Sequence, residues 1–140
     1  MFNIHFGSLM RSGSVAAVVA GFLYLLALTP FFDNLITVLV LAGAVIIPLG
    51  AGLGYGYLAP GEETMAQSTV GGALSGLVAG IILGIAVGIN AFMLAGLSTG
   101  LLGYAIVGGV GVTIVVAVIF GLFAAIMGAI GGVLWQIIQK

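Results

Sequence analysis

The charged residues of this chain stand at the ends of long apolar runs and not inside them. Apart from the tyrosines, the ionisable side chains are His5, Arg11, Asp33, Glu62, Glu63 and Lys140. With 63% hydrophobic and 4% charged residues, and a mean hydropathy of +1.46, the chain has too few charges to cover a water-soluble domain. The sequence therefore predicts an integral membrane protein whose solvent is lipid.

Four of the apolar runs are long enough to cross a bilayer, which takes roughly 20 residues of helix. They cover residues 15–32, 35–59, 70–94 and 113–138. We therefore expect residues 1–140 to form one all-α transmembrane domain, a polytopic membrane protein with four transmembrane helices in a glycine-rich, tightly packed bundle.

Two segments lie outside these runs. Residues 1–14 hold several large apolar side chains ahead of the first run, and we expect them to lie in the membrane interface. Residues 101–111, LLGYAIVGGVG, are apolar but interrupted by glycines. They are compatible with a short helix, a re-entrant piece or an early start of the last span.

The two cationic residues give a topology. An even number of spans places both termini on one side, and Arg11 and Lys140 stand just outside the first and last spans. The positive-inside rule then predicts cytoplasmic N- and C-termini for this multi-pass protein. A net charge of −1 offers no cationic surface for nucleic acid, and the absence of cysteine excludes disulfides and thiolate metal sites.

Glycine recurs at every fourth position along the third run, as Gly72, Gly76, Gly80, Gly84 and Gly88. Glycine disfavours a helix in water, but between helices in lipid small residues let two backbones approach closely. The row drifts by about 40° per step, so it favours an inclined crossing or two different neighbours. We expect a glycine zipper, whose partner is either this chain or another.

Weaker versions of the pattern include Gly21 in the first run and Gly128 and Gly132 in the fourth. We expect these three glycines to pack against neighbouring helices as well.

Three residues are candidates for a role beyond packing. Pro48 predicts a kink in the second span, either a static bend or part of a pathway. Asn90 lies inside the third span, where its amide can bond a neighbouring helix or line a polar path. His5 is the one imidazole, either solvated or a ligand of a haem or chlorophyll-type pigment.

Other polar and aromatic residues have ordinary explanations. Tyr55, Tyr57 and Trp135 are placed to be anchors at the level of the lipid headgroups. Glu62 and Glu63 follow Pro-Gly, and we expect a solvated turn that caps the next helix.

No apolar run contains Asp, Glu, Lys or Arg that could relay a proton or couple an ion. We therefore expect no enzymatic activity and no cofactor. The preferred function is a small structural or accessory subunit of a larger membrane complex, whose partners are the bilayer and other subunits or copies of itself. The alternative is a channel for a small uncharged solute, formed by the chain or its homo-oligomer. The third hypothesis is a pigment-binding subunit.

Overall fold

The structure is a computed structural model that describes residues 4–27, 33–59, 61, 63–99 and 102–139. Within the helices, the side chains of residues 25–27, 33–37, 39–41, 90–99 and 102–108 lie outside the description. The described chain is all-helical. Its four helices are α1 (Phe6–Ala27), α2 (Asp33–Leu58), α3 (Met65–Thr99) and α4 (Leu102–Ile138).

Three stretches of these helices are long and apolar enough to cross a membrane by length and composition, namely Phe6–Tyr24, Met65–Ile89 and Gly109–Ile138. Among the described residues, the apolar stretch of α2 is shorter and covers Ala42–Leu58. The prediction of a helical membrane protein therefore agrees with the structure.

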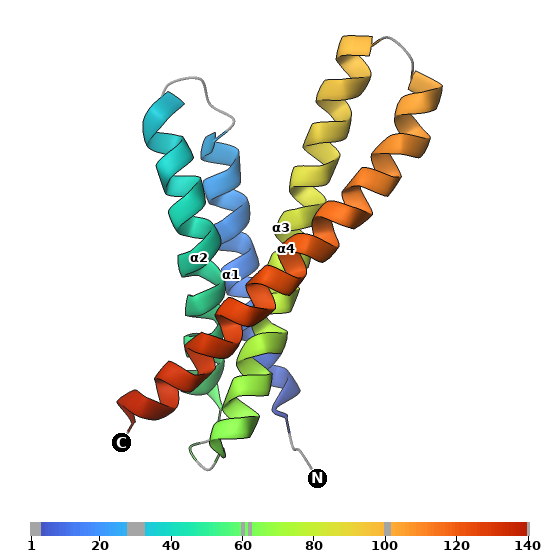
Figure 1. Cartoon of the computed structure of the whole chain (residues 1–140). Coiled ribbons are helices and arrows are strands. Elements are labelled where there is room, and N and C mark those ends of the chain that lie inside the picture. The colour runs from blue at the N-terminus through green and yellow to red at the C-terminus, as the bar shows by residue number, and fades with distance from the viewer. Residues whose placement is uncertain (1–3, 28–32, 60, 62, 100–101, 140) are drawn as a thin grey trace.

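The helices form two hairpins, α1–α2 and α3–α4, as Figure 1 shows. They converge at the end that holds both chain termini, and the hairpins diverge toward the opposite end (Figure 1). Helix α4 runs obliquely across α3, and it also contacts α2, while α1 contacts α2 and α3.

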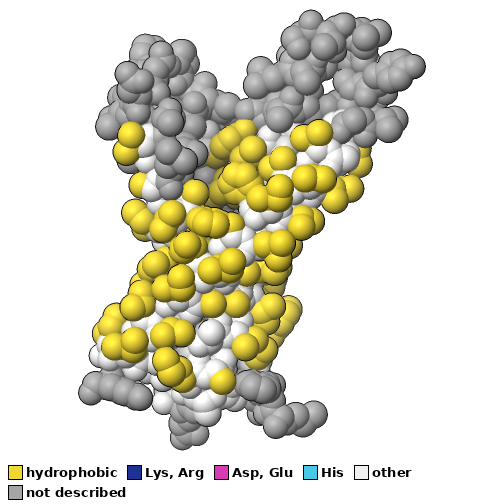
Figure 2. Space-filling model, in the orientation of Figure 1, with side chains coloured by type: hydrophobic (Ala, Val, Ile, Leu, Met, Phe, Trp, Pro, Cys, Tyr) yellow, Lys and Arg dark blue, Asp and Glu magenta, His cyan; other side chains and the backbone are white. Residues whose placement is uncertain are grey.

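Most of the buried side chains are small, with Tyr55 and Leu9 as the large exceptions, and many large apolar side chains face outward. Ala16, Ala51 and Ala79 are buried together, with Ile47 packed against them. Large apolar side chains such as those of Val18 and Phe22 are exposed, and Figure 2 shows apolar side chains along the outside of the described helices. A bilayer favours this distribution, because lipid solvates large apolar side chains while small residues allow helices to approach.

Helix α3 begins with a capping box. Thr64 Oγ1 accepts a hydrogen bond from the Gln67 backbone N–H at 3.3 Å, and the Thr64 backbone N–H donates to Gln67 Oε1 at 2.8 Å. This reciprocal pair satisfies two amides that have no partner inside the helix. The helix therefore starts ahead of the expected 70–94 span, and Thr64 and Gln67 supply the described cap.

One boundary differs from the sequence expectation, and a second, which the sequence left open, is an early start of the last span. Helix α1 begins at Phe6, so residues 6–14, expected as part of an interfacial segment, continue the helix of the first span. Helix α4 is continuous from Leu102, so the glycines of 101–111 do not break it after that point. A broken backbone in lipid leaves polar groups unpaired at several kcal/mol each, which exceeds the roughly 1 kcal/mol that a glycine costs a helix.

Candidate functional site

The five-glycine row of α3 faces α4 along its whole length. A Cβ built at any of the five glycines would lie closer than 3.0 Å to an atom of α4. A Cβ at Gly72 would lie nearest Gly128, and one at Gly76 nearest Ala124. A Cβ at Gly80 would meet Ala124 and Phe120, one at Gly84 would meet Ala117, and one at Gly88 would meet Thr113. The row therefore meets one neighbouring helix, and that helix belongs to the same chain.

Small residues on α4 complete this contact. A Cβ at Gly128 would overlap the carbonyl oxygen of Gly72, and a Cβ at Gly132 would overlap the carbonyl oxygen of Ser68. Without Cβ atoms, the glycine Cα hydrogens point at these carbonyl oxygens, a weak contact that recurs at close helix interfaces. The two backbones can approach this closely only because neither position has a side chain.

Helix α2 meets the same part of α4 from another side. A Cβ at Gly52 would overlap the carbonyl oxygen of Gly128, and a Cβ at Gly131 would overlap that of Leu49. The carbonyl of Gly128 is thus approached by glycines of two helices. By contrast, a Cβ at Gly21 would have no described atom within 4 Å, so the packing expected there is not observed.

Buried serines bond across the helices beside the glycines. Ser68 Oγ donates to the Gly132 carbonyl at 3.0 Å, and Ser12 Oγ and Ser75 Oγ share a hydrogen bond at 2.7 Å. Ser75 Oγ also reaches the Leu9 carbonyl at 3.4 Å. Ser68 and Ser75 are completely buried, so these bonds satisfy hydroxyl groups that neither water nor lipid reaches.

A polar cluster joins α2 and α4 to the segments that precede α1 and α3, at the end where the termini lie. The Tyr55 hydroxyl donates to Glu63 Oε1 at 2.7 Å and accepts from the His5 backbone N–H at 3.3 Å. Gln136 Nε2 of α4 donates to the Glu63 carbonyl at 3.3 Å. Tyr55 is 0% exposed, and its ring occupies the space that a side chain at Gly71 would fill. Tyr55 is therefore a buried bridge and not the headgroup anchor expected from the sequence.

Glu63 also departs from the expected solvated turn. It is half-buried, and its Oε2 is a buried atom without a hydrogen-bond partner among the described residues. Trp135 Nε1 is likewise buried without a hydrogen-bond partner among the described residues. The Trp135 side chain packs over Gly56 and meets the Tyr57 ring edge to face, with ring centres 5.5 Å apart and an interplanar angle of 87°.

Helix geometry explains why Tyr55 and Tyr57 differ. Two residues apart on an α-helix point about 200° away from each other, so one can be buried when the other is exposed. Tyr57 is 71% exposed. The sequence contains the spacing, but nothing in it marks Tyr55 as the inward member or Glu63 as its partner.

The remaining candidates are Pro48, His5 and Asn90. Pro48 is buried in α2, and the helix continues through it. His5 is exposed, and its backbone N–H donates to the Tyr55 hydroxyl. The side chain of Asn90 lies outside the described residues.

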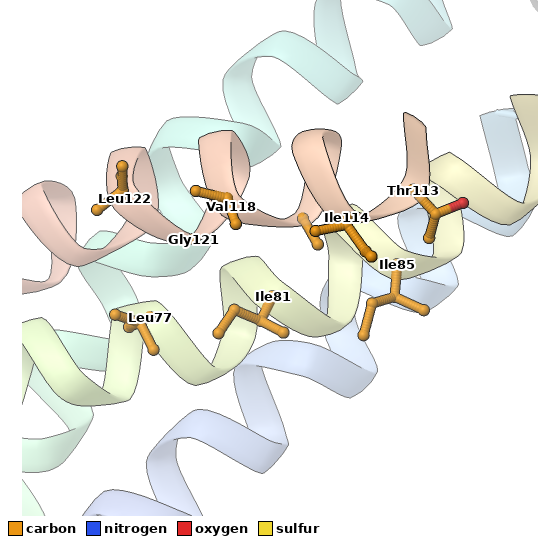
Figure 3. Close-up of a pocket in the computed structure, with 9 residues that line it drawn as sticks. Leu77, Ile81, Ile85, Thr113, Ile114, Val118, Gly121 and Leu122 are labelled. Atoms are coloured by element: carbon orange, nitrogen blue, oxygen red, sulfur yellow. The ribbon is translucent and has the colours of Figure 1, made fainter. Parts of the chain in front are cut away.

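Two large apolar grooves open on the sides of the bundle. One, of about 330 Å³, lies between α3 and α4 beside the glycine row, with Leu77, Ile81 and Ile85 facing α4 residues that include Ile114 and Val118 (Figure 3). The other, of about 410 Å³, lies between α1 and α2. Both are lined by apolar atoms almost throughout, which suits contact with lipid chains or apolar helices.

Within the described part of the chain, no three His, Asp or Glu side chains gather into a group that could hold a metal ion. No known family model matches the chain, and neither a curated protein nor a solved structure matches it significantly.

Proposed function

We propose that the protein is a four-span membrane protein with a non-catalytic structural or accessory role in a larger membrane complex. The observation that supports this role most is the outward display of large apolar side chains around an interior made mostly of Ala, Gly and Ser. Such a chain can fill and brace an assembly, because its own helices are held together by backbone approach and its outer face is free for neighbours.

In this proposal the glycine zipper works inside the chain. The rows on α3 and α4 make a rigid hairpin, with α2 joined to it at Gly52 and Gly128. The space where the two hairpins begin to diverge is a smaller apolar groove of about 180 Å³, between residues such as Ala20, Gly43 and Leu83. A helix of a partner subunit fits a surface of this kind better than a polar ligand does.

The grooves also weigh against a conduit. All three have few polar atoms in their walls, whereas solute pathways are lined by polar groups. The conduit therefore ranks below the structural subunit. The conduit and the pigment-binding subunit are both outcomes of the test below.

The test is extraction from the native membrane in a mild detergent, followed by native mass spectrometry. We expect the chain to co-isolate with unlike membrane subunits in a fixed ratio. A homo-oligomer that carries an uncharged solute across liposomes would instead establish the conduit. Visible absorbance that stays with the purified protein would establish a pigment subunit.

A further inference from the structure

The groove between α1 and α2 differs from the α3–α4 groove in where it ends. Its floor includes Ala16 and Ala51, and it extends along α2 from Ile46 to Tyr57 and Leu58. Leu58 is the last residue of α2, at the end of the bundle that holds both termini (Figure 1). The α3–α4 groove, lined by residues between Leu77 and Leu122, does not include a helix end.

The length of this groove matches one half of a bilayer. Ile46 and Leu58 are 12 positions apart (58 − 46). At 1.5 Å per residue, that separation is roughly 18 Å along the helix. One leaflet contributes about 15 Å of hydrocarbon. A chain lying in the groove would therefore run from the interface to near the middle of the membrane.

The one described cation stands at the interfacial end of the groove. Ser8 Oγ donates to the Leu58 carbonyl at 2.9 Å, which places the first turns of α1 beside the end of α2. Arg11 follows one turn later, and Val15, which lines the groove, lies a further turn along the same face of α1. Arg11 is exposed, and its guanidinium makes no hydrogen bond or ion pair with a residue that the structure describes.

We propose that the α1–α2 groove binds one phospholipid, with an acyl chain along the groove and a negatively charged headgroup on Arg11. The apolar walls fit the chain, and the guanidinium forms paired hydrogen bonds with a phosphate. The exposed Tyr57 ring stands at the level where aromatic side chains meet headgroups. This site is independent of any partner subunit, because its walls belong to this chain alone.

Gly50 provides a way to fill the groove without disturbing the fold. It lines the groove, and a Cβ built there meets no described atom within 4 Å. Gly50→Leu should therefore occupy the space of the acyl chain. Gly111→Leu is the matched control, since Gly111 is equally open but lies on α4 outside the groove. Val15→Trp fills the groove from the α1 wall and serves if Gly50→Leu fails to fold.

The experiment uses the full chain in nanodiscs of phosphatidylcholine and phosphatidylglycerol, then native mass spectrometry after release into detergent. We expect the wild type and Gly111→Leu to retain one phosphatidylglycerol, and Gly50→Leu or Val15→Trp to retain none. Arg11→Gln should lower the preference for phosphatidylglycerol about five-fold, since one cation near a membrane surface contributes about a factor of that size.

Three outcomes would overturn the proposal. Equal lipid retention by Gly50→Leu, Val15→Trp and the wild type would show that the groove is not the site. If Gly111→Leu lost phosphatidylglycerol as well, the loss in Gly50→Leu would not place the lipid in the α1–α2 groove. A change of oligomeric state in Gly50→Leu, with no lipid retained by the wild type, would assign the groove to a second copy of the chain.

Discussion

Gly72 of α3 and Gly128 of α4 approach each other so closely that a Cβ on either one would overlap the carbonyl oxygen of the other. The contact is reciprocal and involves only backbone atoms. A rotamer change in a neighbouring side chain therefore cannot relieve an added methyl group. The separation of the two helices depends on the absence of side chains at both positions.

The first prediction concerns that absence. Gly128→Ala should destabilise the protein by about 1–3 kcal/mol, the usual range for overpacking a close contact. Gly111→Ala, whose Cβ meets open space, should be neutral or stabilising by up to about 1 kcal/mol, because alanine restricts the unfolded chain. Unfolding in mixed micelles with increasing dodecyl sulfate measures both. Equal losses in the two variants would contradict the packing account.

The second prediction concerns the hydrogen bond between Ser12 and Ser75, which joins α1 to α3 at 2.7 Å. Alanine at each position alone and at both together forms a double-mutant cycle. We expect a coupling energy of about 0.6–1.5 kcal/mol, the range for hydroxyl bonds between membrane helices and within protein interiors. The same unfolding assay supplies the values. Strictly additive effects would mean that the pair does not stabilise the fold.

The third prediction separates the two tyrosines at the polar end. Tyr55→Phe removes the hydrogen bond to Glu63 and leaves the part-buried Glu63 Oε1 without its donor, so we expect a loss of about 1–3 kcal/mol. Tyr57→Phe keeps the ring against Trp135 and should change stability by less than about 0.5 kcal/mol. Thermal melting followed by the fluorescence of the single tryptophan reports on both. A larger loss of stability in Tyr57→Phe than in Tyr55→Phe would mean that the Tyr57 hydroxyl, and not that of Tyr55, makes the stabilising hydrogen bond.

The fourth prediction is the proposed topology of four spans. The chain contains no cysteine, so single-cysteine variants can be labelled without background. Gly61→Cys should react with a membrane-impermeant maleimide from the same side as a cysteine at Lys140, and Gly100→Cys from the opposite side. Comparing the labelling of intact cells with that of inverted vesicles shows on which side of the membrane each cysteine lies. If α2 did not span, positions 61 and 140 would still share a side, because both α3 and α4 lie between them, but Ile4→Cys would react from the side opposite to them. Four spans place Ile4→Cys on the same side as positions 61 and 140.

Several features of the fold follow from local sequence. The long apolar runs predict membrane helices, and the structure has four helices, three of them with stretches able to cross a bilayer. The spacing of the glycines predicts a stripe of small residues on α3, because helix periodicity alone places every fourth residue near one face. The sequence left segment 101–111 open between a short helix, a re-entrant piece and an early start of the last span, and the structure has the last of these from Leu102 onward.

The polar end of the bundle could not be predicted. The structure brings together Tyr55 of α2, Glu63 of the turn that precedes α3, and Gln136 of α4. Each residue alone has a common explanation as an interfacial or solvated side chain. Their contact depends on how the helix ends are placed against one another, which no local pattern records.

The sequence by itself determined the solvent of this protein, its helical class and the positions where side chains are absent, because these depend on composition and on the period of a single helix. Only the tertiary structure decided that α4 is the partner of the glycine row, that Gly72 lies opposite Gly128, and that Tyr55 points inward. Pairing and register depend on contacts between residues far apart in the chain, and several glycine-bearing helix faces could have met the row equally well by composition.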